Sequence, residues 1–298
     1  MTIDRNRPFG RLVTAMVTPF HADGSLDADG AARLAAYLVD EQGNDALVVN
    51  GTTGESATTT DAEKETVLRA VIEAVGDRAR VIAGVGTSDT HHTIELAHAA
   101  EKAGAHGALV VTPYYNKPPQ AGLVRHFTAV ADASGLPLML YDIPARTGTA
   151  IETETLVRVA EHERIVAVKD AKGDIAETSW ATSRTDLAFY SGDDKNTLPL
   201  LAVGAVGVVG VPTHLFGRPT KAMIEAFERG DVAEALRLHH ATLPAYTGFF
   251  RTQGVILTKA ALAALGLPAG PVRSPLVDAT ESQLAQLRAD CAEAGLTL

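Results

Sequence analysis

Short apolar segments alternate along this chain with longer amphipathic ones. Most of the short segments are apolar at successive positions, a pattern typical of parallel strands that are buried on both faces. The longer segments have the character of helices that pack one face against a sheet. The pattern predicts strands over Leu12–Thr18, Ala46–Val49, Val81–Gly84, Ala108–Val111, Leu138–Tyr141, Ile165–Lys169, Leu187–Tyr190 and Gly207–Val211.

Capping residues mark the ends of the predicted helices. Thr60 and Glu63 have the spacing of a capping box, and Gly43 and Gly104 stand where helices should end. Between the strands, helices are predicted over Ala28–Gln42, Asp61–Val75, Thr90–Ala103, Ala121–Ser134, Glu152–Ala160, Ile175–Ser183, Lys195–Val203 and Pro219–Arg229. Three more are predicted near the C-terminus, over Val232–Tyr246, Gly254–Leu265 and Glu281–Ala294.

Eight strand–helix units predict an α/β protein with a (β/α)8 TIM barrel, a fold that typically takes about 250 residues. We expect a catalytic barrel over residues 1–230 and a C-terminal three-helix extension over residues 231–298, packed on the barrel because no Pro/Ser-rich linker separates them. The competing architecture is a doubly wound open sheet, which usually carries Gly-x-Gly-x-x-Gly after its first strand. Here the first strand ends in Thr18-Pro19-Phe20, so the barrel is favoured.

The composition excludes several classes of protein. The 298 residues are 46% hydrophobic and carry a formal net charge of −10, so a phosphate backbone is a poor partner and nucleic-acid binding is not expected. The single cysteine, Cys291, cannot form an internal disulfide, which fits a reducing cytoplasmic compartment. The N-terminus lacks the pattern of a signal peptide, and the longest apolar run is shorter than the roughly 20 residues of a membrane helix. We expect a cytoplasmic globular protein without membrane contact.

Polar residues gather directly after the predicted strands, where a barrel places its active site. Lys169 is the most informative of them, because it ends an apolar strand and its ammonium would emerge inside the barrel mouth. Desolvation lowers the pKa of such an amine, which can then attack a ketone to form a Schiff base. Pairing with Asp170 or Asp174, or extension into solvent, is the structural alternative.

Three further candidates accompany this lysine. Thr52 and Thr53 lie in a Gly-Thr-Thr-Gly turn whose N–H groups and hydroxyls can hold a carboxylate, although such turns are also common without a ligand. Tyr141 ends a neighbouring strand and is suited to a proton relay or simply to a core position. Arg146 is suited to clamp a second carboxylate or to form a surface ion pair. No His-Glu-x-x-His pattern or phosphate loop is present, so no metal site is expected.

Together these motifs carry a resemblance to a known family. Gly-Thr-Thr-Gly-Glu at 51–55, Thr-Pro-Tyr-Tyr-Asn at 112–116, Tyr-Asp-Ile-Pro-Ala-Arg-Thr-Gly at 141–148, Lys169 and Ser-Gly-Asp-Asp at 191–194 occur in order. The chain resembles the dihydrodipicolinate synthase (4-hydroxy-tetrahydrodipicolinate synthase) family of pyruvate-dependent class I aldolases, which includes N-acetylneuraminate lyase. The resemblance covers nearly the whole chain.

The resemblance implies an aldol condensation of pyruvate with aspartate 4-semialdehyde in the diaminopimelate and lysine pathway, without a bound cofactor. The resemblance also implies that Lys169 forms the imine with pyruvate. Tyr141, Thr52 and Tyr115 match the proton relay, with Tyr115 supplied by a neighbouring subunit. Further matches are the pyruvate-binding positions, at Thr53, Gly192 and Val209, and the aldehyde-binding position, at Arg146. The resemblance also implies a homotetramer built as a dimer of dimers.

Two departures from the family pattern are Asp142, where many relatives carry Asn, and Asp170-Ala171-Lys172, which replaces a commoner Glu-Ala-Thr. Neither matches a position with an assigned chemical role. A sister aldolase that cleaves sialic acid or a 2-keto-3-deoxy sugar acid would share Lys169 and Tyr141, but Arg146 favours the synthase. A non-catalytic barrel would be expected to lose these residues.

The resemblance finally bears on feedback by lysine. Lysine-inhibited relatives bind the effector at a dimer interface, and this chain keeps Ser56, Ala57 and Tyr114 of that site. The remaining ligand positions hold different residues here, namely Asp61, Lys64, Ser88 and His92. Loss of an anionic partner and the added charge of Lys64 disfavour an effector with two ammonium groups. Inhibition by lysine is therefore predicted to be weak or absent.

Overall fold

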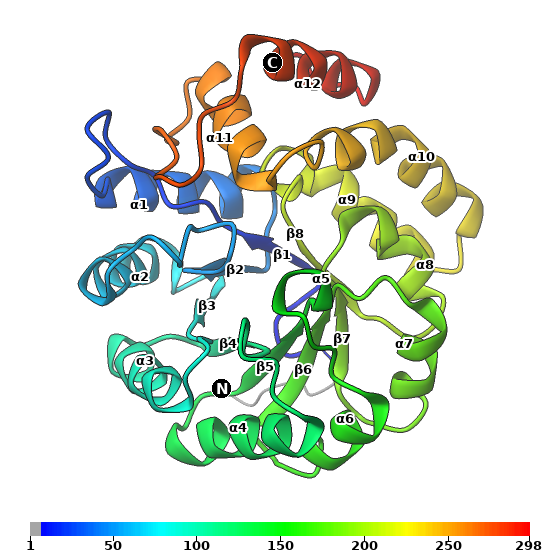
Figure 1. Ribbon diagram of the computed structural model, residues 1–298. Coiled ribbons are helices and arrows are strands. Elements are labelled where there is room, and N and C mark those ends of the chain that lie inside the picture. The colour runs from blue at the N-terminus through cyan, green and yellow to red at the C-terminus, as the bar shows by residue number, and fades with distance from the viewer. Residues whose placement is uncertain (1–6) are drawn as a thin grey trace.

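The computed structural model describes residues 7–298; residues 1–6, on which the expectation about a signal peptide depends, lie outside the described part. Across that part eight parallel strands form a closed barrel, each pairing with the next and β8 returning to β1 (Figure 1). The predicted (β/α)8 fold is therefore confirmed. The strands are β1 (Leu12–Ala15), β2 (Ala46–Val49), β3 (Arg80–Gly84), β4 (Gly107–Val111), β5 (Leu138–Asp142), β6 (Ile165–Asp170), β7 (Ala188–Ser191) and β8 (Gly207–Gly210).

Helices surround the barrel, as Figure 1 shows. The helices of the barrel are α1 (Ala28–Ala36) with the π-helical turn η1 (Tyr37–Glu41), α2 (Asp61–Val75), α3 (Thr90–Ala103), α4 (Gln120–Ala133), α5 (Pro144–Thr147), α6 (Thr153–Val159), α7 (Ile175–Thr182), the 3-10 turn η2 (Asp194–Asn196), α8 (Thr197–Leu201) and α9 (Thr213–Glu228). They are followed by α10 (Val232–Gly248), α11 (Gly254–Ala264) and α12 (Glu281–Glu293).

The strands are buried on both faces, as their continuous apolar character predicts. Side chains such as Ile82 and Met139 pack inside the barrel, whereas Val81 and Leu140 belong to a separate core between the strands and the helices. Successive residues of a strand point to opposite faces, so each strand contributes to both cores. This alternation also decides which residues at the strand ends can point into the barrel mouth.

Several predicted boundaries differ from the observed ones for local reasons. The predicted helix that starts at Pro219 begins earlier, at Thr213, because two helical segments join across a kink at Phe216, whose φ of −116° is not helical. The predicted helix over residues 195–203 divides into η2 and α8. The short helix α5 was not predicted, since four residues leave no periodic pattern.

The predicted caps fold as expected. The Thr60 hydroxyl accepts a hydrogen bond from the Glu63 N–H at 3.2 Å, and the Glu63 carboxylate accepts one from the Thr60 N–H at 2.8 Å. Gly104 ends α3 with a φ of +90°. Both caps fix where a helix meets the loop that joins it to the barrel.

The last three helices pack on one side of the barrel. α10 lies along α9, and α12 packs against α10 and α11 (Figure 1). The boundary at residue 230 stays a prediction. Within residues 7–298 no helix is both long and apolar enough to cross a membrane.

Candidate active site

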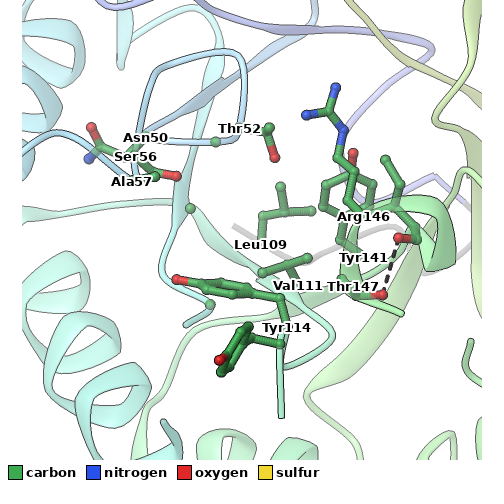
Figure 2. Close-up of a pocket in the computed structure, with 15 residues that line it drawn as sticks. Asn50, Thr52, Ser56, Ala57, Leu109, Val111, Tyr114, Tyr141, Arg146 and Thr147 are labelled. Carbon is green, nitrogen blue, oxygen red and sulfur yellow. Dashed lines mark hydrogen bonds between the residues drawn. The ribbon is translucent and has the colours of Figure 1, made fainter. Parts of the chain in front are cut away.

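The loops at the carboxyl ends of several strands enclose a cavity of about 390 Å³. Figure 2 shows Thr52, Tyr141 and Arg146 on one side of it and Asn50, Ser56 and Ala57 across from them. The other lining residues are Gly51, Gly84, Gly86, Leu109, Val111, Tyr114, Tyr115, Ile143 and Thr147. Four predicted site residues thus meet at this cavity: Thr52, Tyr115, Tyr141 and Arg146.

Lys169 lies at the base of this site. Its strand neighbour Val168 belongs to the outer core, so Lys169 points inward, where its Nζ lies 4.2 Å from the centroid of the Tyr141 ring. The residue is 5% exposed. Asp170 and Asp174, the alternative partners, are engaged elsewhere: Asp170 accepts from the Thr178 hydroxyl, and Asp174 caps α7. The structure thus favours the reactive interpretation of Lys169 over the surface one.

Burial changes the pKa of this lysine. Desolvation lowers the pKa of Lys169 to about 8, the nearby Asp194 carboxylate opposes that shift, and the Arg146 guanidinium adds to it. A pKa of about 8 leaves a substantial fraction of neutral amine at slightly alkaline pH. The neutral amine is the nucleophilic form.

Asp194 is a further part of the site. It belongs to the Ser-Gly-Asp-Asp motif, but the sequence predicted no role for it. It is buried at the start of η2, and its Oδ2 accepts a hydrogen bond from the Val211 N–H at 3.2 Å. Gly210 lies against its other carboxylate oxygen, and a Cβ there would collide with it. Burial raises the pKa of Asp194 to about 7. Its position in a Ser-Gly-Asp-Asp motif after a strand is the only signal of it in the sequence.

Tyr141 forms the boundary between Lys169 and the cavity. Burial raises the pKa of its hydroxyl to about 12, while Arg146 and the Thr52 hydroxyl act in the opposite direction. Tyr141 is therefore protonated at neutral pH and available as a proton donor. The neighbouring hydroxyl and cation reduce the cost of forming the phenolate.

The turn over residues 51–56, here called the threonine turn, is fixed by its own backbone. The Gly54 N–H donates to the Gly51 carbonyl at 3.0 Å, and the Glu55 N–H donates to the Thr52 carbonyl at 3.1 Å. From the loop after β1, the Thr18 hydroxyl donates to the Gly54 carbonyl at 2.7 Å. This bonding fixes the two threonines in a rigid turn at the barrel mouth.

Four predicted residues lie outside the lining of the main cavity among the residues that the structure describes: Lys169, Thr53, Gly192 and Val209. Gly192 nevertheless packs on the lysine, because a Cβ there would lie 3.1 Å from Lys169 Cγ. Val209 is fully buried inside the barrel. Thr53 lines a second cavity of about 280 Å³ beside the first, between the threonine turn and α11.

Arg146 lies on α5 and lines both cavities. Its guanidinium donates to the Gln253 Oε1 at 2.8 Å, and Gln253 precedes α11. The C-terminal extension thereby orients the arginine at the mouth. Sequence reasoning did not find Gln253, because nothing in its local pattern connects it with residues more than a hundred positions earlier.

Tyr115 is the most exposed large side chain of the site. It is 93% exposed, and its φ of +73° places it in the left-handed region that non-glycine residues rarely adopt. A strained backbone that holds an aromatic ring in solvent is unusual within one chain. The side chain is therefore accessible to another molecule.

The two departures from the family pattern meet in space. Lys172 Nζ lies 3.5 Å from the Asp142 Oδ2 and 3.4 Å from the Glu177 Oε2. Asp142 and Lys172 are both buried in their side chains, and burial raises the pKa of Asp142 to about 7. The two residues that depart from the family pattern thus form one buried contact. This contact lies beside the site, because Asp142 directly follows Tyr141. Nothing in the sequence indicates that they are in contact.

Metal-ligating side chains do not gather in the described part of the chain: within residues 7–298 no group of three or more His, Cys, Asp or Glu could hold a metal ion. The adjacent His91 and His92 pair instead with Glu95 and Asp61. Cys291 is buried in α12, and burial raises its pKa to about 12, so it is a poor nucleophile.

Comparison with known proteins gives consistent results. The protein-family model described as "Dihydrodipicolinate synthetase family" matches residues 8–294. A protein of Acidothermus cellulolyticus named 4-hydroxy-tetrahydrodipicolinate synthase is 74% identical over 98% of this chain and 95% of its own. "4-Hydroxy-tetrahydrodipicolinate synthase 2" of Streptomyces coelicolor is 64% identical over 98% and 97%. A crystal structure of DHDPS from Cyanidioschyzon merolae with lysine bound superimposes with a TM-score of 0.94 at 46% identity, covering 96% and 98% of the two chains.

Proposed function

Because this chain belongs to the dihydrodipicolinate synthetase family, we propose that it is a lyase that condenses pyruvate with aspartate 4-semialdehyde to 4-hydroxy-tetrahydrodipicolinate, in the diaminopimelate and lysine pathway. The observation that carries the proposal is Lys169, a buried amine with a lowered pKa that lies against the Tyr141 ring at the mouth of a TM barrel.

The covalent step begins with the neutral Lys169 amine. Its lone pair attacks the keto carbon of pyruvate, and the resulting carbinolamine loses water to form a protonated imine. Loss of a methyl proton then gives an enamine, whose carbon attacks the aldehyde carbon. Tyr141 donates and recovers protons at the imine and at the aldehyde oxygen, with Thr52 and Tyr115 completing the relay. The imine serves as the electron sink, so no bound cofactor is required.

The carboxylate of pyruvate is assigned to the threonine turn. Thr53 offers a hydroxyl and an N–H in a turn whose later N–H groups are already used internally. Backbone at Gly192 and Val209 completes the pocket, and the absence of a side chain at Gly192 lets that strand approach Lys169.

The second substrate is assigned to Arg146. A guanidinium at the mouth can bind the carboxylate of aspartate 4-semialdehyde through two parallel hydrogen bonds. Gln253 already holds one of its nitrogens at 2.8 Å, which limits the rotation of the side chain. A polyol substrate would gain little from this cation, so Arg146 supports the synthase over a sialic-acid or sugar-acid aldolase.

The exposure of Tyr115 supports a homo-oligomer. With 93% of the residue exposed, it can complete the relay of a neighbouring subunit, and we assign the chain to a homotetramer built as a dimer of dimers. Its partners are then small-molecule substrates and copies of itself, with neither nucleic acid nor membrane, in the cytoplasm.

A coupled assay with pyruvate and a panel of aldehydes tests this function. Aspartate 4-semialdehyde should give the highest kcat/KM, and N-acetylmannosamine and sugar aldehydes should react poorly. A higher kcat/KM with a sugar aldehyde would reassign the chain to a sister aldolase. Absence of turnover with every aldehyde would favour a non-catalytic barrel.

A further inference from the structure

Glu55 is the last residue of the Gly-Thr-Thr-Gly-Glu motif and has no task in the reaction described above. It is 4% exposed although it carries a carboxylate, and its φ of +56° lies in the left-handed region. It takes part in the backbone hydrogen bonding of the threonine turn, because its N–H donates to the Thr52 carbonyl. A charged, buried residue in an unfavourable backbone conformation requires specific partners.

Those partners come from the C-terminal extension. The Glu55 Oε1 lies 2.5 Å from Nζ of Lys259 on α11, and both side chains are 2% exposed. The other carboxylate oxygen accepts a hydrogen bond from the Arg273 N–H at 2.8 Å. Lys259 in turn donates to the Pro271 carbonyl at 2.8 Å. Figure 1 shows α11 at the end of the barrel beside α1.

An aromatic ring fixes the cations of this cluster. Lys259 Nζ and the Arg273 guanidinium each lie 4.1 Å from the centroid of the Phe20 ring, which follows β1. Arg273 is held further by an ion pair with Glu63 of α2, at 2.6 Å. The pair formed by Glu55 and Lys259 therefore joins three distant parts of the chain: the loop after β1, the threonine turn and the extension.

Stability alone is a weak reason for such a pair. Taking two charges out of water costs about as much free energy as their attraction returns, and apolar replacements of buried pairs are often neutral or stabilising. What the pair supplies is geometry. Both carboxylate oxygens of Glu55 have partners, Lys259 and the Arg273 N–H, and these contacts hold the side chain in place. The position of its side chain in turn holds the backbone of Glu55, which lies two residues after Thr53.

We propose that Lys259 is a positioning residue for pyruvate binding: through Glu55 it holds the threonine turn in the shape that receives the substrate carboxylate. The C-terminal extension is then a working part of the active site and not only a support for the barrel. This inference rests on the function proposed above, in which the threonine turn binds pyruvate.

The test compares Lys259→Met, Glu55→Gln and the double variant. Gln keeps the shape of Glu55 and an acceptor for the Arg273 N–H, and the double variant leaves no unpaired buried charge. The readouts are Tm, kcat, the KM of each substrate, and the pyruvate concentration that gives half-maximal borohydride trapping on Lys169. The trapping readout needs no aldehyde, so failure of the proposed second substrate and failure of this inference are distinguishable.

We expect both single variants to lower Tm. They should also raise the pyruvate KM and the half-trapping concentration by about 10- to 100-fold, the range seen at metal sites when a residue that orients a ligand is lost. The KM for aspartate 4-semialdehyde should change little. The double variant should recover much of the Tm but keep the raised pyruvate requirement. The matched control is Glu234→Gln with Arg237→Met, an exposed pair at 2.7 Å on α10 of the same extension, which should leave every readout unchanged.

Recovery of both Tm and the pyruvate KM in the double variant would show that the pair has only a structural role. An unchanged pyruvate KM in a folded single variant would overturn the proposal as well. If Lys259→Met does not fold, Glu55→Gln and the double variant decide in the same way, since Gln still accepts from the Arg273 N–H and the double variant leaves no unpaired buried charge.

Discussion

At the scale of single residues, burial sets the pKa values of a few ionisable groups in the site. Lys169 and Asp194 occupy the same desolvated interior, and burial disfavours the charged form of each. Their attraction opposes that tendency, so the charge of one depends on the other. Asp194 thereby influences how much of the lysine is neutral at a given pH.

The pH dependence follows from the lowered pKa of Lys169. The amine reacts when neutral, so kcat/KM for pyruvate should rise with pH and level off above about 8. Asp194→Asn removes the carboxylate that raises this pKa, so the rising limb should move to lower pH. Initial-rate profiles measure the shift, and Asp186→Asn, at an exposed position before β7, is the control. A limb that stays in place or moves to higher pH would exclude this role for Asp194.

Arg146 is proposed to select the aldehyde. Arg146→Ala should remove a charge-assisted contact worth roughly 1.5–3 kcal/mol, seen as a higher KM for aspartate 4-semialdehyde. Imine formation with pyruvate should survive. Arg69→Ala, which breaks an exposed pair with Glu65 on α2, serves as the control. Equal weakening toward both substrates would instead indicate that Arg146 has a structural role.

At the scale of elements, α2 and α3 carry three of the positions that the family resemblance assigns to lysine binding, namely Asp61, Lys64 and His92. The Asp61 carboxylate already lies 2.9 Å from Nε2 of His92 and 3.3 Å from Nζ of Lys64. Thr60, and not Asp61, caps α2. Asp61 is therefore occupied by internal partners and is not free for an incoming ammonium group.

Lysine at millimolar concentration should accordingly leave the rate in the coupled assay almost unchanged. His92→Glu, which supplies the acid that the family resemblance places there and frees Asp61, should increase the sensitivity to lysine. Strong inhibition of the unaltered enzyme by submillimolar lysine would contradict this account.

The elements also show how far the sequence could predict the molecule. Continuous apolar strands and marked helix ends predict the barrel. The strand ends also point to Lys169 and Tyr141, which the structure places side by side, with Lys169 Nζ 4.2 Å from the centroid of the Tyr141 ring. The contacts that were missed join distant segments: Gln253 with Arg146, Lys259 with Glu55, and Lys172 with Asp142. Local periodicity contains no information on such pairs, because they arise only when the barrel closes and the extension packs on it.

At the scale of the whole molecule, the proposed relay needs a second copy of the chain. Tyr115 extends into solvent from a strained backbone, and its role in the relay requires that it enter a neighbouring site. Each active site would then combine Lys169 of one subunit with Tyr115 of the other. This arrangement makes activity a property of the dimer.

Complementation between two inactive variants tests the shared site. Tyr115→Phe and Lys169→Ala should each lose most activity alone. After mixing under conditions of subunit exchange, half of the dimers are mixed and each contains one intact site, so about one quarter of the original activity should return. Mixing Lys169→Ala with itself is the control. No recovery despite exchange would show that Tyr115 acts within its own chain or not at all.

The central claim is that the enzyme works through a covalent imine on the buried Lys169. Incubation with pyruvate and borohydride, followed by peptide mass spectrometry, tests it most directly. The account predicts one stable adduct, on the Lys169 peptide, with loss of activity in proportion and no adduct in Lys169→Ala. An adduct on another lysine such as Lys172 or Lys259, or no adduct in active enzyme, would contradict it.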